Sequence, residues 1–131
     1  MDVEGWDTAT KLLILTNVLM NEEKAFEDIS VEGITKITPQ EVKYCLAEGY
    51  KYKLVGKTVK EKGKIQMTVK LEKFDFTHPL YGVDGKNKAV RYISDILGDL
   101  TIIGGASGVT PAAASVLRDL ININRGYRFC R

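Results

Sequence analysis

The sequence predicts an α+β fold in which helices cover a mixed but mostly antiparallel sheet. Apolar residues recur at helical spacing in two segments near the N-terminus and in one near the C-terminus. Between these segments apolar and polar residues alternate, which is typical of strands with one buried face. The expected order of two helices, four strands and a last helix favours α+β over a regular strand–helix alternation.

The first expected helix covers residues 6–20. Its apolar residues leave only a narrow polar strip of Thr10 and Asn17. A helix that is apolar around most of its surface is typically buried, so we expect this one in the middle of the core. The apolar residues are Leu12, Leu13, Ile14, Leu15, Val18 and Leu19.

The second expected helix begins after Thr38 and stops at Gly49. Thr38 suits the N-cap, Pro39 suits the first helical position, and Glu41 stands where a capping box needs an acid. The preceding residues 29–37 are expected to form a short strand or a loop.

The remaining strands are expected to form a hairpin and two shorter strands. Residues 50–54 and 65–71 alternate with period two on either side of Glu61-Lys62-Gly63, which indicates a turn. Two further short strands are expected at 89–93 and 100–103. A last helix is expected from Ala112 to about Ile121, with Pro111 in its first turn.

The charge balance gives no reason to expect nucleic acid or an anionic membrane as a partner. Lys and Arg number 19 against 17 Asp and Glu. The hairpin carries many lysines among tyrosines, a composition that can bind nucleic acid. However, Glu61 and Glu72 interrupt it, and solvated strands commonly carry lysine against aggregation. No apolar run is long enough to span a bilayer.

We expect one domain, residues 1–131, in a reducing, cytoplasmic compartment. Cys45 and Cys130 lie far apart without metal-type spacing, and no charged-then-apolar leader is present. His78 has no Cys, His or carboxylate cluster near it in the sequence, so no metal site is predicted.

Asp7 and Lys11 are the first candidate site residues. They stand four residues apart, share one stripe of the first helix and lead into Ile14 and Val18, which we expect to continue that stripe inward. One interpretation is a surface ion pair worth roughly 0.2–0.5 kcal/mol. The other is a partly desolvated lysine that donates or accepts a proton beside a carboxylate. The spacing alone does not choose between them.

The glycine-rich segment 104–111 is the second candidate. It joins a strand to a helix, where backbone N–H groups can approach a phosphate or a ring closely. The alternative is a tight connection that needs glycine only for its dihedral angles. The segment matches neither the P-loop nor the dinucleotide fingerprint.

Several segments together resemble homoserine dehydrogenases. Residues 2–11 resemble their D-x-x-G-x-D-x-x-x-K motif, and the G-x-x-x-G-x-x-P loop ends at Pro111. The resemblance covers nearly the whole chain in the right order, although the loop departs from the family pattern at Gly105 and Ala106. Between these ends it includes Glu32-Gly33-Ile34-Thr35-Lys36-Ile37-Thr38, Gly49-Tyr50-Lys51-Tyr52-Lys53-Leu54, His78-Pro79-Leu80, Val83-Asp84-Gly85 and Asn87.

The resemblance implies an NAD(P)-dependent oxidoreductase of threonine and methionine biosynthesis, which interconverts L-homoserine and L-aspartate 4-semialdehyde. It implies that Lys11 exchanges the proton at the substrate oxygen. It implies that Asp2 and Asp7 bind the substrate, that Asp7 also tunes Lys11, and that Gly108 approaches the cofactor.

The resemblance also implies a two-domain enzyme, of which this chain is the substrate-binding and dimerisation part. The family's dinucleotide-binding Rossmann domain and a substrate-binding glutamate precede the position of Asp2, so Met1 is interpreted as the edge of a larger enzyme. We therefore expect a homodimer that binds no NAD(P) and turns over no substrate as an isolated fragment. The alternative is a non-catalytic module of the same fold that binds an amino acid or dimerises for regulation.

Overall fold

The computed structural model describes residues 4–128, so Asp2 and Cys130 lie outside the described range. The chain divides into two compact units, the first ending at His78 and the second starting at Pro79, and each is described by itself. The elements are α1 (Trp6–Leu19), η1 (Phe26–Asp28), β1 (Ile29–Val31), α2 (Pro39–Ala47), β2 (Lys51–Glu61), β3 (Lys64–Phe74), β4 (Lys88–Ser94), β5 (Gly98–Gly104) and α3 (Val109–Asn124).

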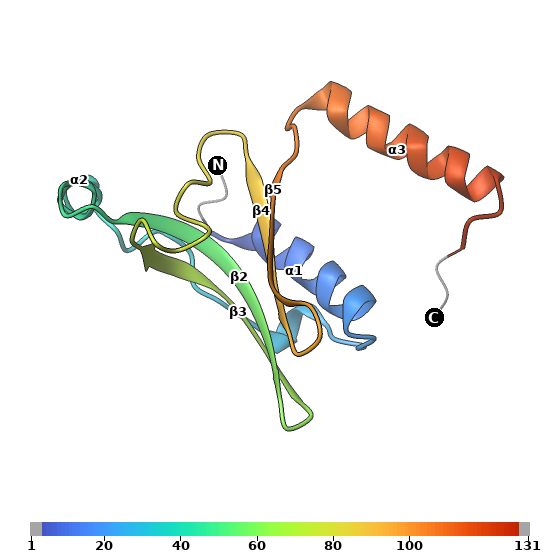
Figure 1. Ribbon diagram of the computed structural model, residues 1–131, viewed down its shortest axis with the longest axis horizontal. Helices are drawn as coiled ribbons and strands as arrows, with labels where there is room; N and C mark the ends of the chain where they lie inside the picture. Colours follow the sequence, from blue (N-terminus) through green and yellow to red (C-terminus); the bar gives the residue numbers. More distant parts are fainter. Residues whose placement is uncertain (1–3, 129–131) are drawn as a thin grey trace. The chain divides into compact units, whose positions relative to one another are not determined.

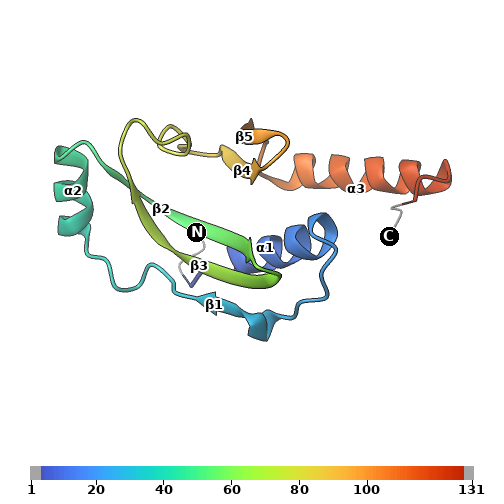
Figure 2. The same ribbon diagram turned by 60° about the horizontal axis from the view of Figure 1, so that its bottom comes forward.

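The first unit is built on a three-stranded sheet in the order β1-β3-β2, whose long strands β2 and β3 are labelled in Figure 1. The long strands β2 and β3 are antiparallel, whereas β1 pairs with β3 in parallel. Figure 2 shows short β1 running beside the long hairpin. The predicted α+β class with a mixed, mostly antiparallel sheet is therefore confirmed, and the segment left open as strand or loop supplies β1.

The hairpin turn consists of Lys62 and Gly63, as the sequence predicts. Both residues have positive φ, 48° and 78°, which a two-residue turn of type I′ requires. This turn places Glu61 opposite Lys64 and fixes the register of all the pairs that follow.

The core of the first unit joins α1 to the sheet. Five buried residues form it: Ala9, Leu12, Ile29, Met67 and Val69. Leu13, Phe26, Val31, Leu54 and Ile65 pack around them. These contacts bury one face of α1 against one face of the sheet, the arrangement that a sheet with a single apolar face needs.

The prediction that the first helix lies in the middle of a core was wrong, because most of α1 is not buried. Only Ala9, Leu12 and Thr16 of α1 are buried. Ile14 and Val18, which were expected to point inward, are 57% and 58% exposed. The physical reason is that α1 packs on one side only, so its second apolar face has no cover within the described residues of the first unit.

The second helix has the predicted capping box. The Glu41 backbone N–H donates to the Thr38 hydroxyl, and the Glu41 carboxylate accepts from the Thr38 N–H (2.7 Å) and hydroxyl (2.8 Å). These hydrogen bonds favour the charged carboxylate and lower the pKa of Glu41 below its ordinary value of 4.5. The α2 helix packs on β2 and buries Cys45.

The second unit consists of the antiparallel pair β4–β5 followed by α3. The two predicted strands are confirmed with slightly longer bounds, and Pro111 lies in the first turn of α3 as predicted. Across the pair, Arg91 donates two hydrogen bonds to the Asp99 carboxylate (2.9 and 2.6 Å), which raises the pKa of Arg91.

The cap of α2 gives a stability prediction. We expect Thr38→Ala to lower the free energy of unfolding by about 1 kcal/mol, because the first turn of α2 loses an acceptor. Urea denaturation followed by circular dichroism measures it. The matched control is Thr35→Ala, an exposed threonine outside the cap, for which we expect a change within about 0.5 kcal/mol. Equal losses in the two variants would contradict a capping role for Thr38.

The lowered pKa of Glu41 gives a pH prediction. A carboxyl whose pKa is lower in the folded state stabilises the fold above its unfolded pKa, and that contribution is lost as pH falls through the folded value. We therefore expect the wild-type chain to exceed Glu41→Gln in stability near neutral pH. The difference should shrink as pH falls below 4.5, and thermal melts across this range measure it. A difference independent of pH would contradict the argument.

Candidate active site

The two main candidate residues meet on the outer face of α1. The Lys11 ammonium donates to the Asp7 carboxylate one helical turn earlier. Both side chains are open to solvent, 55% exposed for Lys11 and 66% for Asp7. The structure thus brings together the pair that the sequence singled out, but within the described chain the lysine is not desolvated.

Large apolar side chains flank this charged pair. Ile14 and Val18 follow Asp7 and Lys11 along α1, and Trp6 precedes them; all three are more than half exposed. Charged groups beside an exposed apolar row are typical of a surface that another molecule or domain covers. The arrangement places an amine at the border of an exposed apolar surface.

Close backbone contacts hold α1 in place. Gly5 adopts a left-handed conformation (φ 86°) before the helix starts, and a Cβ there would lie 3.1 Å from side-chain atoms of Val31 and Val69. On β2, a Cβ at Gly56 would lie 3.2 Å from the Thr8 methyl group and 3.4 Å from the Leu12 Cβ. Farther along, Thr16 and Thr58 share a hydrogen bond between their hydroxyl groups (2.6 Å).

The end of α1 is held by polar groups. The Asn17 side-chain amide donates to the Lys24 carbonyl and accepts from the Lys24 N–H, each at 2.9 Å. Lys60 of β2 pairs with Glu22 at 2.9 Å, and this ion pair lowers the pKa of Glu22. These contacts tie the segment after α1 back to the helix and to the sheet.

Gly108 stands at the N-cap of α3 in the second unit, with φ 134°. Among the described residues of this unit, a Cβ there would meet only the Pro111 ring, at 3.9 Å, which leaves the backbone open to a close approach. Gly104 and Gly105 also have positive φ. The positive φ values agree with a connection that needs glycine for its dihedral angles, while the close approach of a phosphate or a ring stays a prediction. Gly108 belongs to a different unit from Asp7 and Lys11.

No metal-binding group of three or more His, Cys, Asp or Glu side chains exists among residues 4–128. His78 stacks on the Phe74 ring with centroids 3.8 Å apart. No helix in the described range is long and apolar enough to cross a membrane.

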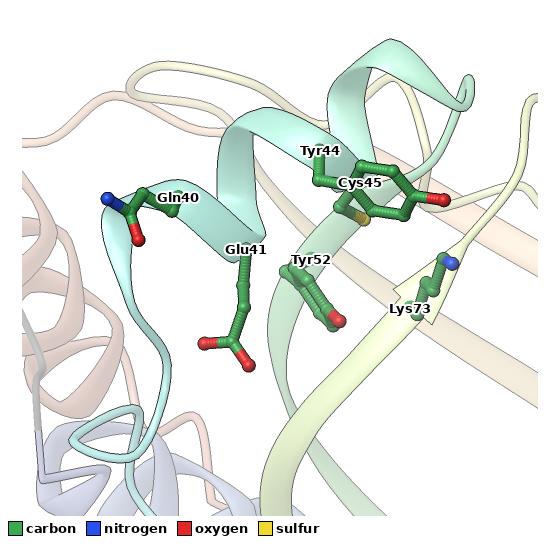
Figure 3. Close-up of a pocket in the computed structure, with 6 residues that line it drawn as sticks. All are labelled: Gln40, Glu41, Tyr44, Cys45, Tyr52 and Lys73. Carbon is green, nitrogen blue, oxygen red and sulfur yellow. The ribbon is translucent and has the colours of Figure 1, made fainter.

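A separate open groove of about 400 Å³ lies between α2 and the hairpin (Figure 3). Its charged groups already have roles in the fold, because Glu41 caps α2 and Lys73 lies 4.1 Å from the centre of the Tyr50 ring. The lining residues are Gln40, Glu41, Tyr44, Cys45, Tyr52 and Lys73. Asp7, Lys11 and Gly108 do not line it.

The family model of homoserine dehydrogenase matches residues 1–121. The chain belongs to the homoserine dehydrogenase family. The enzyme of Bacillus subtilis (strain 168) is 32% identical over 127 residues, which are 97% of this chain and 29% of that protein. The NAD(+)-dependent homoserine dehydrogenase of Pseudomonas canavaninivorans is 30% identical over 95% of this chain and 36% of that protein.

Solved homoserine dehydrogenases share the fold. The crystal structure of the S. aureus enzyme at pH 6.5 superposes with a TM-score of 0.85 and 30% identity, over 99% of this chain and 33% of that one. A hyperthermophilic archaeal homoserine dehydrogenase mutant, solved in complex with NADPH, superposes with a TM-score of 0.75 and 27% identity, over 99% of this chain and 36% of that one. The chain thus spans about a third of the length of its relatives.

The sequence had not singled out the contacts that position α1 in this family member. Gly56 carried a signal, because an isolated glycine in a strand pattern indicates a close backbone approach. The hydrogen bond between Thr16 and Thr58 carried none, since neither residue belongs to a recognisable motif. Asp2, predicted to bind substrate, lies outside the described residues.

Proposed function

We propose that this chain is the substrate-binding and dimerisation part of an NAD(P)-dependent homoserine dehydrogenase, which interconverts L-homoserine and L-aspartate 4-semialdehyde. The observation that carries the proposal is the Asp7–Lys11 pair on a helix within the family match. The names of the relatives support the reaction, and one NAD(+)-dependent enzyme and one complex with NADPH support either dinucleotide.

In this proposal Lys11 transfers the proton. Oxidation of the substrate alcohol needs a base for the hydroxyl proton, and NAD(P), when bound, would supply the hydride acceptor. The Lys11 amine accepts that proton, and in the reverse direction the ammonium returns it to the carbonyl oxygen. Asp7 lies within hydrogen-bonding reach of the Lys11 nitrogen, so its carboxylate orients the amine.

Asp7 and Asp2 also bind the substrate in this proposal, with their carboxylates supplying acceptors for its polar groups. Gly108 forms the contact with the dinucleotide, since its backbone is open and a side chain there would fill the space. The dinucleotide-binding domain of the complete enzyme covers the exposed row of α1, which removes water from around Lys11 and strengthens its electrostatic interactions.

Homodimerisation is part of the same proposal. It is supported by the exposed apolar side chains of the second unit, among them Val116, Leu117, Leu120 and Ile123 of α3.

The first test concerns Lys11. In a complete enzyme that contains this chain, we expect Lys11→Ala to lower kcat by about 10²–10⁴-fold, the usual contribution of a general acid–base group. Lys11→Arg should not restore the rate, because a guanidinium does not give up its proton. NADPH absorbance measures turnover. The matched control is Lys43→Ala, an exposed lysine on α2, which should keep the wild-type rate.

Equal rates for the wild-type enzyme and Lys11→Ala would overturn the role of Lys11.

A second test distinguishes the enzyme from a non-catalytic module. We expect the 131 residues alone to show no homoserine oxidation, and we expect activity once they are joined to a family dinucleotide-binding domain. Failure of the joined protein to turn over homoserine, although folded and able to bind NADPH, would favour the non-catalytic module.

A further inference from the structure

Gly56 lies under the helix that carries the proposed active-site pair. It stands within β2 opposite Val69 of β3, away from any turn. Its φ lies outside the range that favours glycine, so its backbone could be adopted by any residue. Glycine inside a strand is destabilising relative to alanine. Local backbone conformation therefore gives no reason for glycine here.

The reason for glycine at position 56 is steric, because α1 packs closely against β2 at this point. A Cβ at position 56 would lie 3.2 Å from Thr8 Cγ2, 3.4 Å from Leu12 Cβ and 3.5 Å from Leu12 Cδ1. The first of these distances is shorter than van der Waals contact allows without movement. Thr8 and Leu12 directly follow Asp7 and Lys11 in the sequence, so a shift of the Thr8–Leu12 stripe shifts the charged pair with it.

The same stripe fixes α1 along β2. One turn after Leu12, the Thr16 hydroxyl meets the Thr58 hydroxyl at 2.6 Å, and Thr58 lies two residues after Gly56 on the same face of β2. Thr16 is 2% exposed, so the helix side of this partly buried hydrogen bond is shielded from water. The hydroxyl pair sets the position of the helix along the strand, while the glycine sets its distance from the strand.

We propose that Gly56 is a positioning residue: the absence of a side chain at this point of β2 sets the height of α1 above the sheet and thereby the position of Lys11. The inference rests on the proposed function of Lys11. It goes beyond that function by naming the strand residue on which the geometry of the site depends. Proton transfer is sensitive to such geometry, since a displacement of about 1 Å can cost about 100-fold in rate.

The chain offers a compensating substitution. Thr8→Ser removes only Cγ2, the atom nearest to the position of the added methyl group, and keeps the hydroxyl. In a complete enzyme containing this chain, we expect Gly56→Ala to lower kcat roughly tenfold, because the helix must give by a few tenths of an ångström. Thr8→Ser alone should stay within about twofold of the wild type, and Gly56→Ala/Thr8→Ser should recover most of the loss.

A second measurement uses the 131-residue chain and needs no activity. We expect Gly56→Ala to shift the backbone amide resonances of residues 6–19 in NMR spectra, and we expect Thr8→Ser in the double variant to move them back. A melting temperature for each variant separates displacement from unfolding. The proposal would be overturned if Gly56→Ala lowered the melting temperature but left kcat per folded enzyme unchanged. Gly56 would then affect stability alone.

Two further results would overturn it: unshifted α1 resonances in Gly56→Ala, or a lost rate that Thr8→Ser does not restore. Failure of the proposed function would look different. Lys11→Ala would then keep full activity, whereas the resonance shifts and their reversal would still report whether Gly56 seats the helix.

Discussion

The contact between α1 and the three-stranded sheet is the interaction on which the first unit depends. Two long strands and one short strand cannot bury an apolar face by themselves. The α1 helix supplies the second layer, since the core joins Ala9 and Leu12 to Ile29, Met67 and Val69. The contact is close because two glycines, Gly5 and Gly56, leave room for it. The contact between α1 and the sheet therefore determines both the fold of the first unit and the position of Asp7 and Lys11.

Because α1 buries only one face, it presents the other with both a charged pair and an apolar row. In an isolated helix such a row would favour association, and an ion pair beside it would contribute little. If a second domain covered this face, the electrostatic interaction between the two charges would be stronger, because removal of water lowers the effective dielectric constant. The exposure of Asp7 and Lys11 is thus compatible with the proposed chemistry.

The sequence predicted the elements that depend on local rules. The capping box of Thr38 and Glu41, the Lys62-Gly63 turn and the alternating strand beyond it were all foreseen, because each is decided by neighbours in the chain. It did not predict which apolar side chains of α1 are buried, since periodicity gives the width of an apolar face but not the number of its partners. The parallel pairing of β1 and the helix contact at Gly56 depend on segments distant in sequence, which single-residue patterns do not encode.

The parallel strand β1 also has a consequence for the order of folding. The β2–β3 hairpin joins chain neighbours, and hairpins close within about 1–10 μs. The β1 strand can pair with β3 only when the chain between them, which contains α2 and β2, closes into a loop. Pairings between segments so distant in sequence form slowly. The α1 helix touches all three strands, although it precedes them in the sequence and so leaves the ribosome before they do. A growing chain therefore carries Asp7 and Lys11 long before β3 exists to seat them, and the site acquires its geometry only late in folding.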